Sequence, residues 1–158
     1  MRLLMMSLLL ALTGCMTASA PAAPEPVYYV VRHLHTPEGQ RDPDLLPEGR
    51  AAAERLVTML PPPAIIYVSD YKRTRQTAAP IAELYRLTPV VYDPADTPAL
   101  IARVRQGPWP VLIVGHSNTV PDIVAALGGT RPAPLTHPDF GDIWRITADG
   151  TTTRTRIP

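Results

Sequence analysis

Apolar and polar positions alternate between two patterns along most of the chain. Short, continuous apolar runs rich in β-branched and aromatic residues occur at residues 27–31, 64–68, 89–92 and 111–114. Runs of this kind are typical of parallel strands whose two faces are both covered. The segments between them carry apolar residues at every third or fourth position, which predicts helices with one buried face. Strands and helices are therefore expected to alternate.

Helical spacing is found in four segments: residues 47–60, residues 71–87, residues 98–105 and the stretch after Asn118. Pro47 and Glu48 suit the first turn of the first helix, because proline lacks the N–H that a first turn leaves unpaired. Pro80 lies inside the second segment and is expected to interrupt that helix, because it removes a hydrogen bond and crowds the preceding turn.

The last two apolar stretches, residues 143–147 and 152–157, flank the dipeptide Asp149-Gly150, which favours a tight hairpin turn. The complete order is βαβαβαβα followed by a hairpin. A chain of 158 residues suits one domain of this kind. We therefore expect a single three-layer α/β domain over residues 27–158, with a mostly parallel central sheet and flanking helices.

Residues 1–14 are typical of a secretory signal, with one positive charge before an apolar stretch that is too short to span a bilayer. Residues 12–15, Leu-Thr-Gly-Cys, resemble the lipobox of bacterial lipoproteins. In that motif the signal is cut before the cysteine, and the cysteine thiol then carries the lipid. Cys15 is the only cysteine, so it cannot form an internal disulfide.

Residues 15–26 are rich in proline and alanine, which is typical of a flexible or semi-extended tether. A lipid on Cys15 would hold the domain at the periplasmic face of a bacterial membrane, with the lipid anchor as its only membrane contact. Cleavage after Ala20 also fits the signal rule and would release a soluble periplasmic protein.

The charge of the chain is nearly balanced, with 15 basic and 14 acidic residues spread along it. This distribution argues against a nucleic-acid partner. We therefore expect that any anion bound by the protein is small and held locally.

Polar residues follow the predicted strands where each strand ends. They are Arg32 and His33 after the first run, Arg73 after the second, Asp93 after the third and His116 after the fourth. Because ligands of open α/β sheets bind beyond the carboxyl ends of the strands, these side chains are expected to converge on one site.

Two arginines and two histidines suit a phosphate ligand. Guanidinium groups bind phosphate oxygens in bidentate pairs and stay charged at any working pH. A histidine can act as a nucleophile or a general base near neutral pH. Helix N-termini after Tyr71 and Asn118 add backbone donors. The set predicts a phosphoryl-transfer pocket for a small phosphorylated substrate, without a metal or another cofactor.

These segments resemble one known family. Arg32-His33 at a strand end, Ser69 followed by KRTRQTA with Arg73, and Gly115-His116-Ser117 together resemble the histidine phosphatase superfamily, also called phosphoglycerate-mutase-like. The segment GHSNTVP is similar to small bacterial members, some of which are lipoproteins. The resemblance extends from Val27 to about Gly129.

The resemblance implies a function and roles for residues. It implies that His33 takes the phosphoryl group, that Arg32, Arg73 and His116 hold this group, and that an acidic residue protonates the leaving group. Ser117 and Asn118, next to His116, are expected to contribute to binding. The implied enzyme is a metal-independent phosphatase that hydrolyses a phosphomonoester or a phosphoramidate through a phosphohistidine.

The sequence departs from the family in two places. Leu34 and His35 stand where the family usually has glycine or alanine and often glutamate. We expect Leu34 to narrow the pocket mouth and His35 to replace a polar contact. The acid lies in no motif of the family, and its candidates are Asp93, Asp96, Asp122 and Glu83. Asp93 and Asp96 are best placed, beyond a strand end, although each also suits a turn or helix cap.

Three other interpretations fit parts of the sequence. GHSNT matches the Gly-x-Ser-x-Gly elbow of serine hydrolases except at Thr119, and only His137 follows Ser117 as a base. This interpretation leaves Arg32 and His33 without a role. A pair of metal ligands at His33 and His35 lacks a suitably spaced third ligand. The remaining alternative is a phosphate-binding protein on the same fold that lacks a competent acid.

Overall fold

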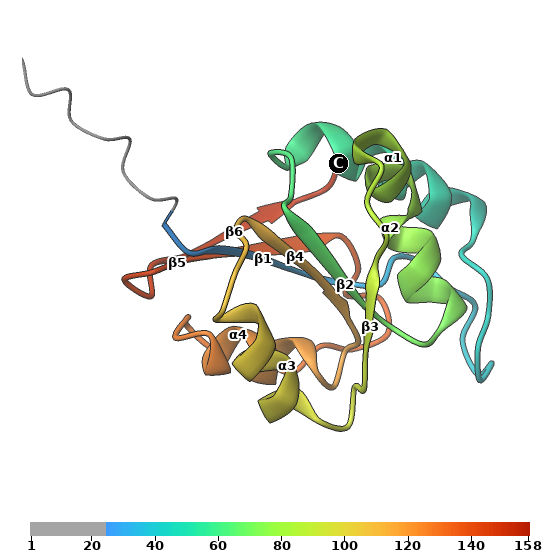
Figure 1. The fold of residues 1–158 in the computed structure, drawn as a ribbon. Coiled ribbons are helices and arrows are strands. Elements are labelled where there is room, and N and C mark those ends of the chain that lie inside the picture. The colour runs from blue at the N-terminus through green and yellow to red at the C-terminus, as the bar shows by residue number, and fades with distance from the viewer. Residues whose placement is uncertain (1–24) are drawn as a thin grey trace, which may run out of the picture.

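The computed structural model describes residues 25–158 and places ten elements in them (Figure 1). The order along the chain is β1 Val27–Arg32, α1 Pro47–Met59, β2 Ile65–Ser69, α2 Lys72–Tyr85, β3 Val90–Tyr92, α3 Thr97–Val104, β4 Val111–Gly115, α4 Val120–Ala126, β5 Asp142–Thr147 and β6 Thr152–Arg156. The alternation expected from the hydrophobic pattern is confirmed, including the final hairpin.

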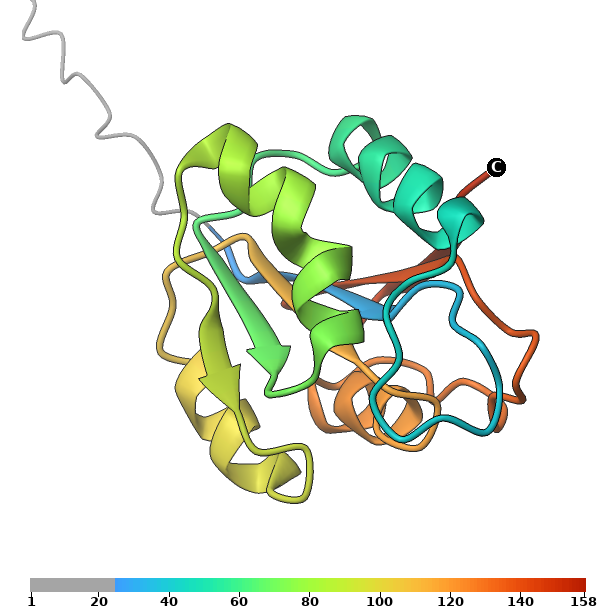
Figure 2. The ribbon, with the colours of Figure 1, turned by 90° about the vertical axis from the view of Figure 1, so that its right-hand side faces the viewer.

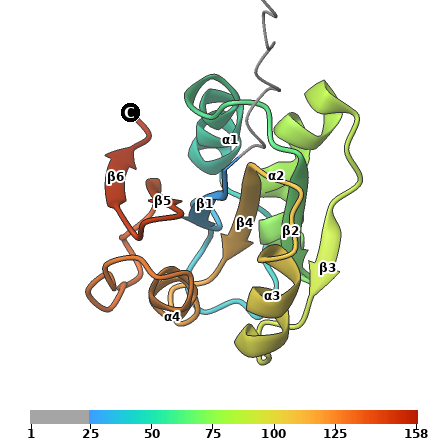
Figure 3. The same cartoon turned by 60° about the vertical axis from the view of Figure 1, so that its left-hand side comes forward.

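The six strands form one sheet in the order β3-β2-β4-β1-β5-β6. The first four of these strands are parallel, whereas β5 runs antiparallel to β1 and β6 antiparallel to β5. Helices α1 and α2 cover one face of the sheet, and α3 and α4 cover the other (Figure 3). The fold is the expected three-layer α/β domain with a mostly parallel sheet.

Two apolar cores, one on each face, result from the strand pattern. Val31 of β1 packs in the core beneath α1 and α2, whereas its neighbour Val30 packs in the core beneath α3 and α4. Both side chains are fully buried, as are all five residues of β4. Because successive side chains of a strand point to opposite faces, a sheet covered on both sides requires continuous apolar runs.

Helix α2 continues through Pro80, contrary to the expectation that this residue interrupts it. Proline removes one hydrogen bond, and the remaining turns of the helix stay packed through Thr77, Ala78 and Ile81. Pro80 is only half-buried, as is Gln76, whose carbonyl would accept from an N–H at position 80.

Helix α1 begins close to the segment that leaves β1. A Cβ atom at Gly49 would lie 2.6 Å from the carbonyl oxygen of His35, so only glycine allows this approach. The backbone N–H of Leu46 donates to the same oxygen at 2.9 Å. The segment 33–46 therefore returns across the end of the sheet, beside the start of α2 (Figure 2).

No helix within residues 25–158 is both long and apolar enough to cross a membrane. The expected signal over residues 1–14, the lipidated Cys15 and most of the tether lie outside the described residues.

Candidate active site

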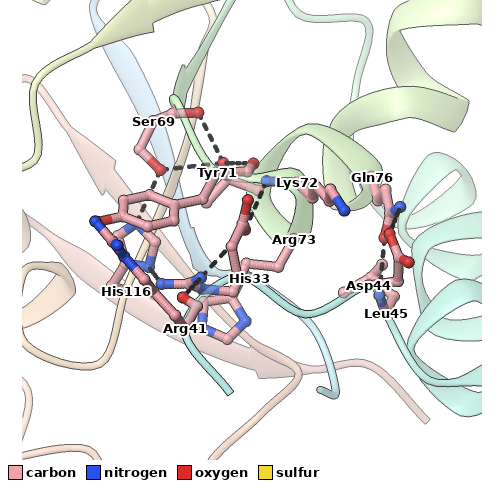
Figure 4. A network of polar contacts seen from close by, with 12 residues as sticks. His33, Arg41, Asp44, Leu45, Ser69, Tyr71, Lys72, Arg73, Gln76 and His116 are labelled. Atoms are coloured by element: carbon pink, nitrogen blue, oxygen red, sulfur yellow. Dashed lines mark hydrogen bonds and ion pairs between the residues drawn. The ribbon is translucent and has the colours of Figure 1, made fainter. Parts of the chain in front are cut away.

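The ends of β1, β2 and β4 bring His33, Arg73 and His116 together, as the strand-end argument predicts (Figure 4). They line an open hollow of about 290 Å³ whose full set of lining residues is His33, Tyr71, Arg73, Pro94, His116, Ser117 and Asn118. The rings of His33 and His116 have their centroids 5.4 Å apart. His33, Arg73 and His116, with both predicted neighbours of His116, are thus close to one point. Arg32 does not line this hollow, but its guanidinium packs on the ring of Phe140, whose centroid lies 5.8 Å from that of the His33 ring.

His33 is held with one ring nitrogen toward the backbone. Its Nδ1 lies 3.0 Å from the carbonyl oxygen of Leu34, which can only accept, so Nδ1 carries the hydrogen. Burial, with a smaller contribution from the charges around it, lowers the pKa of His33 to about 3. The ring is therefore neutral near pH 7, and Nε2 keeps a free lone pair.

The orientation of His116 is fixed from both sides. Its Nδ1 lies 3.3 Å from Nη2 of Arg73, and its Nε2 lies 2.8 Å from Oγ of Ser69. A guanidinium group only donates, so Nδ1 accepts and the hydrogen is on Nε2, which donates to Ser69. Burial and the charge of Arg73 lower the pKa of His116 to about 4.

Ser69 continues this contact into the base of α2. The Ser69 hydroxyl accepts from His116 and lies 3.1 Å from Oγ1 of Thr74, to which it can donate. Thr74 in turn donates to a backbone carbonyl, with the oxygens of Ser69 and Tyr71 at 2.9 and 2.8 Å. The side chains of Ser69, Thr74 and His116 are all buried or nearly so. Along this series of hydrogen bonds each group donates to the next one away from His116. The Ser69 hydroxyl is therefore left to accept from Nε2, which fixes the tautomer of His116.

Arg73 is held at the edge of the hollow by the segment 33–46. Its Nη1 donates to the carbonyl oxygen of Arg41 at 3.1 Å and lies 3.5 Å from a carboxylate oxygen of Asp42. Its guanidinium carbon lies 4.3 Å from the ring centroid of Tyr71, a cation–π distance. Asp42 also accepts from the backbone N–H of Lys72 at the start of α2.

Arg32 is nearly fully buried, and its Nη1 donates to three backbone carbonyls in the loop before β5. The distances are 2.5 Å to Thr136, 3.3 Å to His137 and 3.0 Å to Asp139. Burial is the main cause that lowers the pKa of Arg32 to about 10, so the group stays charged at neutral pH. Its Nε is buried and has no hydrogen-bond partner in the described part of the chain.

None of the four acid candidates lines the hollow. Asp93 is exposed and accepts from the backbone N–H of Ala95 at 2.8 Å, and Asp96 caps α3 by accepting from Ala99. Asp122 pairs with Arg131, and Glu83 lies on an exposed face of α2. Asp93 is nevertheless adjacent to Pro94, which lines the hollow.

The expectation for Leu34 was wrong. Its side chain is fully buried in the core beneath α1 and α2 and cannot narrow the pocket mouth. The backbone N–H of Leu34 donates to Thr77 of α2, so the chain has turned inward at this position. His35 packs against Phe140 with ring centroids 4.7 Å apart, and its Nδ1 has no partner within residues 25–158.

Ser117 has no hydrogen bond to a histidine in the described structure, since Nε2 of His116 is bonded to Ser69. His137, the base that a serine hydrolase would need, packs its ring against Phe140. The elbow-like sequence therefore lacks the geometry of a nucleophilic serine. No group of three or more histidine, cysteine or acidic side chains suited to hold a metal occurs in residues 25–158.

Sequence reasoning did not predict Ser69, Tyr71, Asp42 or Phe140 as site residues. Ser69 ends β2, so the strand-end argument that identified Arg32 and His116 could also have identified it. Tyr71 directly precedes α2, and its ring packs against the guanidinium of Arg73. Asp42 and Phe140 come from loops that follow no hydrophobic pattern, and nothing local in the sequence indicates their contacts.

Comparison with known proteins gives a partial match to the same superfamily. Residues 28–95 match the model described as Histidine phosphatase superfamily (branch 1). No curated protein matched the sequence. Among solved structures, the protein histidine phosphatase SixA complexed with tungstate is 20% identical, with a TM-score of 0.59 over 82% of this chain and 94% of that chain.

Two further solved structures are similar. A mycobacterial glucosyl-3-phosphoglycerate phosphatase is 17% identical, with a TM-score of 0.59 over 75% of this chain and 88% of that chain. A protein from Thermus thermophilus is 22% identical, with a TM-score of 0.53 over 84% of this chain and 98% of that chain. Likeness at these identities establishes the fold. The chain therefore has the histidine phosphatase fold, and its residues 28–95 match branch 1 of that superfamily.

Proposed function

We propose that the protein is a phosphatase that works through a phosphohistidine at His33. The observation that carries the proposal is the hydrogen bond from Nδ1 of His33 to the Leu34 carbonyl, which leaves the Nε2 lone pair free. This ring lines the same hollow as Arg73 and His116. A neutral imidazole beside cationic donors is suited to attack the phosphorus of a bound phosphate.

In the first step the Nε2 lone pair forms a bond to phosphorus, and the bond from phosphorus to the leaving group breaks in line with it. Water then attacks the phosphorus, the phosphorus–Nε2 bond breaks, and inorganic phosphate is released. In this proposal Arg32, Arg73, Ser117 and Asn118 hold the equatorial oxygens throughout, while His116 keeps Arg73 in place. Positioning and charge supply most of what phosphoryl transfer needs.

The leaving group is proposed to lie beyond Ser117 and Asn118. Both residues line the phosphate hollow and also a second hollow of about 240 Å³, whose other walls come from Pro121 and the loop 131–135. The phosphate hollow thus adjoins a second space that can receive a larger substituent of the substrate.

The lining of the hollow bears on the substrate class. It contains no carboxylate, so protonation of the leaving group is the weakest part of the machinery. An aryl phosphate with an acidic phenol depends least on an acid, and a phosphoramidate whose nitrogen is already protonated in solution releases a neutral amine without a proton from the enzyme. We therefore propose that phosphoramidates and aryl phosphates are turned over ahead of alkyl phosphates. The protein histidine phosphatase SixA is similar in fold, and the activity in its name is consistent with this proposal.

A second candidate function is a phosphate-binding protein with little turnover. The same lack of a lining carboxylate favours it. Turnover of an aryl phosphate separates the two functions, because such a substrate does not need the missing acid. A protein that binds phosphate tightly and never turns over an aryl phosphate would be a binding protein.

The proposed enzyme is tested by trapping the intermediate. Single-turnover reactions with a radiolabelled phosphoryl donor should yield a protein-bound label that is acid-labile and alkali-stable, on a peptide that contains His33. His33→Ala should abolish the label, whereas Ser117→Ala should retain it. A label on Ser117, or turnover that survives His33→Ala, would refute the proposal.

We also propose that Cys15 carries a lipid and that the domain is held at the periplasmic face of a bacterial membrane. This proposal is supported by the Leu-Thr-Gly-Cys sequence at residues 12–15 and by the proline-rich stretch before β1.

A further inference from the structure

Arg32 is held by one short turn, residues 136–140, which we call the 136–140 turn. All three carbonyls that bind Nη1 of Arg32 belong to it. The contacts join positions more than 100 residues apart in the sequence, which places the turn at the end of β1. Bonds to three backbone carbonyls restrict rotation of the long side chain, so they hold the guanidinium in one position.

The 136–140 turn is itself stabilised by Asp139. One carboxylate oxygen of Asp139 accepts from both the backbone N–H and the hydroxyl of Thr136, at 2.7 Å each. The backbone of the turn closes on itself through Asp139 N–H to Thr136 and Phe140 N–H to Pro138. The hydrogen bonds from Thr136 lower the pKa of Asp139, so the carboxylate that holds the turn is ionised at neutral pH.

Phe140 supports the flat face of the guanidinium. Its ring centroid lies 4.1 Å from the guanidinium carbon of Arg32, 5.8 Å from the ring of His33 and 4.7 Å from that of His35. Phe140 is the only phenylalanine in the chain and is nearly fully buried. A cation over an aromatic face is attracted to it, and a desolvated pair gains most.

These contacts leave one edge of the guanidinium without a partner. The carbonyls take Nη1 and the ring covers one face, whereas Nε is buried with no partner among residues 25–158. A buried donor without an acceptor costs free energy, and a phosphoryl oxygen would remove that cost.

We propose that Phe140 and Asp139 are positioning residues for Arg32, which hold its Nε edge ready for a phosphoryl oxygen. The inference rests on the proposed phosphatase function. Holding a long side chain in its bound conformation in advance lowers the entropy cost of binding. Neither residue needs to touch the substrate.

The test measures oxyanion affinity, which does not depend on the chemical step. Tungstate binding is measured by calorimetry for the wild type, Phe140→Leu, Arg32→Ala and the double variant. Phe140→Leu should raise the tungstate Kd about tenfold in the wild-type background. In the Arg32→Ala background the same change should alter the Kd by less than about twofold, because the side chain that it positions is gone.

Asp139 provides a second arm with a matched control. Asp139→Ala should raise the tungstate Kd, and Asp139→Asn should restore much of the affinity, since its amide oxygen can still accept from the Thr136 backbone. Asp149 makes the same kind of turn, with Thr147 and Thr151, in the β5–β6 hairpin. Asp149→Ala should therefore leave the tungstate Kd unchanged.

Equal effects of Phe140→Leu in both backgrounds, or an equal loss in Asp149→Ala, would overturn the positioning role. Thermal unfolding of each variant identifies any that does not fold, and the Asp139 pair then decides. If the wild type binds tungstate and neither Phe140→Leu nor Asp139→Ala changes the Kd, the positioning role is refuted but the phosphatase function is not. A wild type that neither binds tungstate nor turns over an aryl phosphate would refute the phosphatase function as well.

Discussion

Nε2 of His116 donates to the hydroxyl of Ser69, 2.8 Å away, and this bond sets the state of the second histidine. With the hydrogen on Nε2, the lone pair of Nδ1 faces Arg73 at 3.3 Å. Arg73 and His116 thus form one unit anchored in the end of β2. The hydrogen-bond chain through Thr74 makes the start of α2 part of the site.

Ser69→Ala should weaken this unit without touching the substrate. The buried Nε2–H of His116 would lose its acceptor, at a cost of about 1–3 kcal/mol. We expect kcat/KM on an aryl phosphate to fall by about tenfold or more, and thermal stability to fall with it. Ser117 makes no such bond, so Ser117→Ala should lower transition-state stabilisation, as measured by kcat/KM, by only about 0.5–1.5 kcal/mol. Equal losses in the two variants would show that the Ser69 contact has no special role.

The pH dependence of kcat/KM follows from the pKa of His33. The ring must be neutral to attack, and its pKa is lowered from the ordinary 6.5 to about 3. Its neutral fraction therefore stays close to one as the pH falls from about 7 to about 5, where an ordinary histidine would be mostly protonated. We expect kcat/KM for an aryl phosphate to retain its value over this range, apart from protonation of the substrate dianion near pH ~6. A fall in kcat/KM below about pH 6.5 that remains when the substrate has a lower phosphate pKa would contradict this expectation, because it would show that His33 titrates like an ordinary histidine.

Stability should fall with acid over a defined range. Between pH 6.5 and about 3, His33 is protonated in the unfolded chain and neutral in the folded protein, so the unfolded state binds more protons. The free energy of unfolding therefore rises with pH in this window and is flat, for this group, above it. We expect the free energy of unfolding to fall by on the order of a few kcal/mol between about pH 7 and about pH 4. Urea unfolding of His33→Ala should show a smaller loss over the same range.

The elements were predictable because they follow from one strong constraint. A sheet covered on both faces requires continuous apolar runs, and the observed strand and helix bounds lie within two residues of the runs and stripes read from the sequence. His33, Arg73 and His116 converge because carboxyl ends of parallel strands share an edge. The helix through Pro80 was mispredicted, since packing of α2 outweighs one lost bond.

The loops carry what the sequence does not show. Leu34 follows the proposed nucleophile and was expected at the pocket, yet the inward turn after β1 buries it against α2. The contacts of Arg32 to Thr136 and Phe140 span over 100 positions and follow from no periodicity. A loop gains its place from tertiary contacts, so its residues acquire a role only when the strands that flank it are assembled.

Lipid attachment is a prediction from the N-terminal sequence. Cells labelled with a fatty acid should yield labelled wild-type protein that sediments with membranes. Cys15→Ala removes the only thiol and should abolish the label, leaving an uncleaved precursor or a soluble periplasmic form. An unlabelled wild type would refute the lipoprotein proposal and favour cleavage after Ala20.

The identity of the proton donor can be decided at Asp93. Its carboxylate accepts from the N–H of Ala95, and an asparagine at this position keeps an oxygen that can do the same. We expect Asp93→Asn to change kcat by less than about tenfold, and equally for an alkyl phosphate and an aryl phosphate with an acidic phenol. Asp96→Asn, at the cap of α3, tests the other strand-end candidate in the same way. A general acid behaves differently, because only the alkyl leaving group needs its proton. A loss on the order of 10² confined to the alkyl phosphate in Asp93→Asn would identify this residue as the acid.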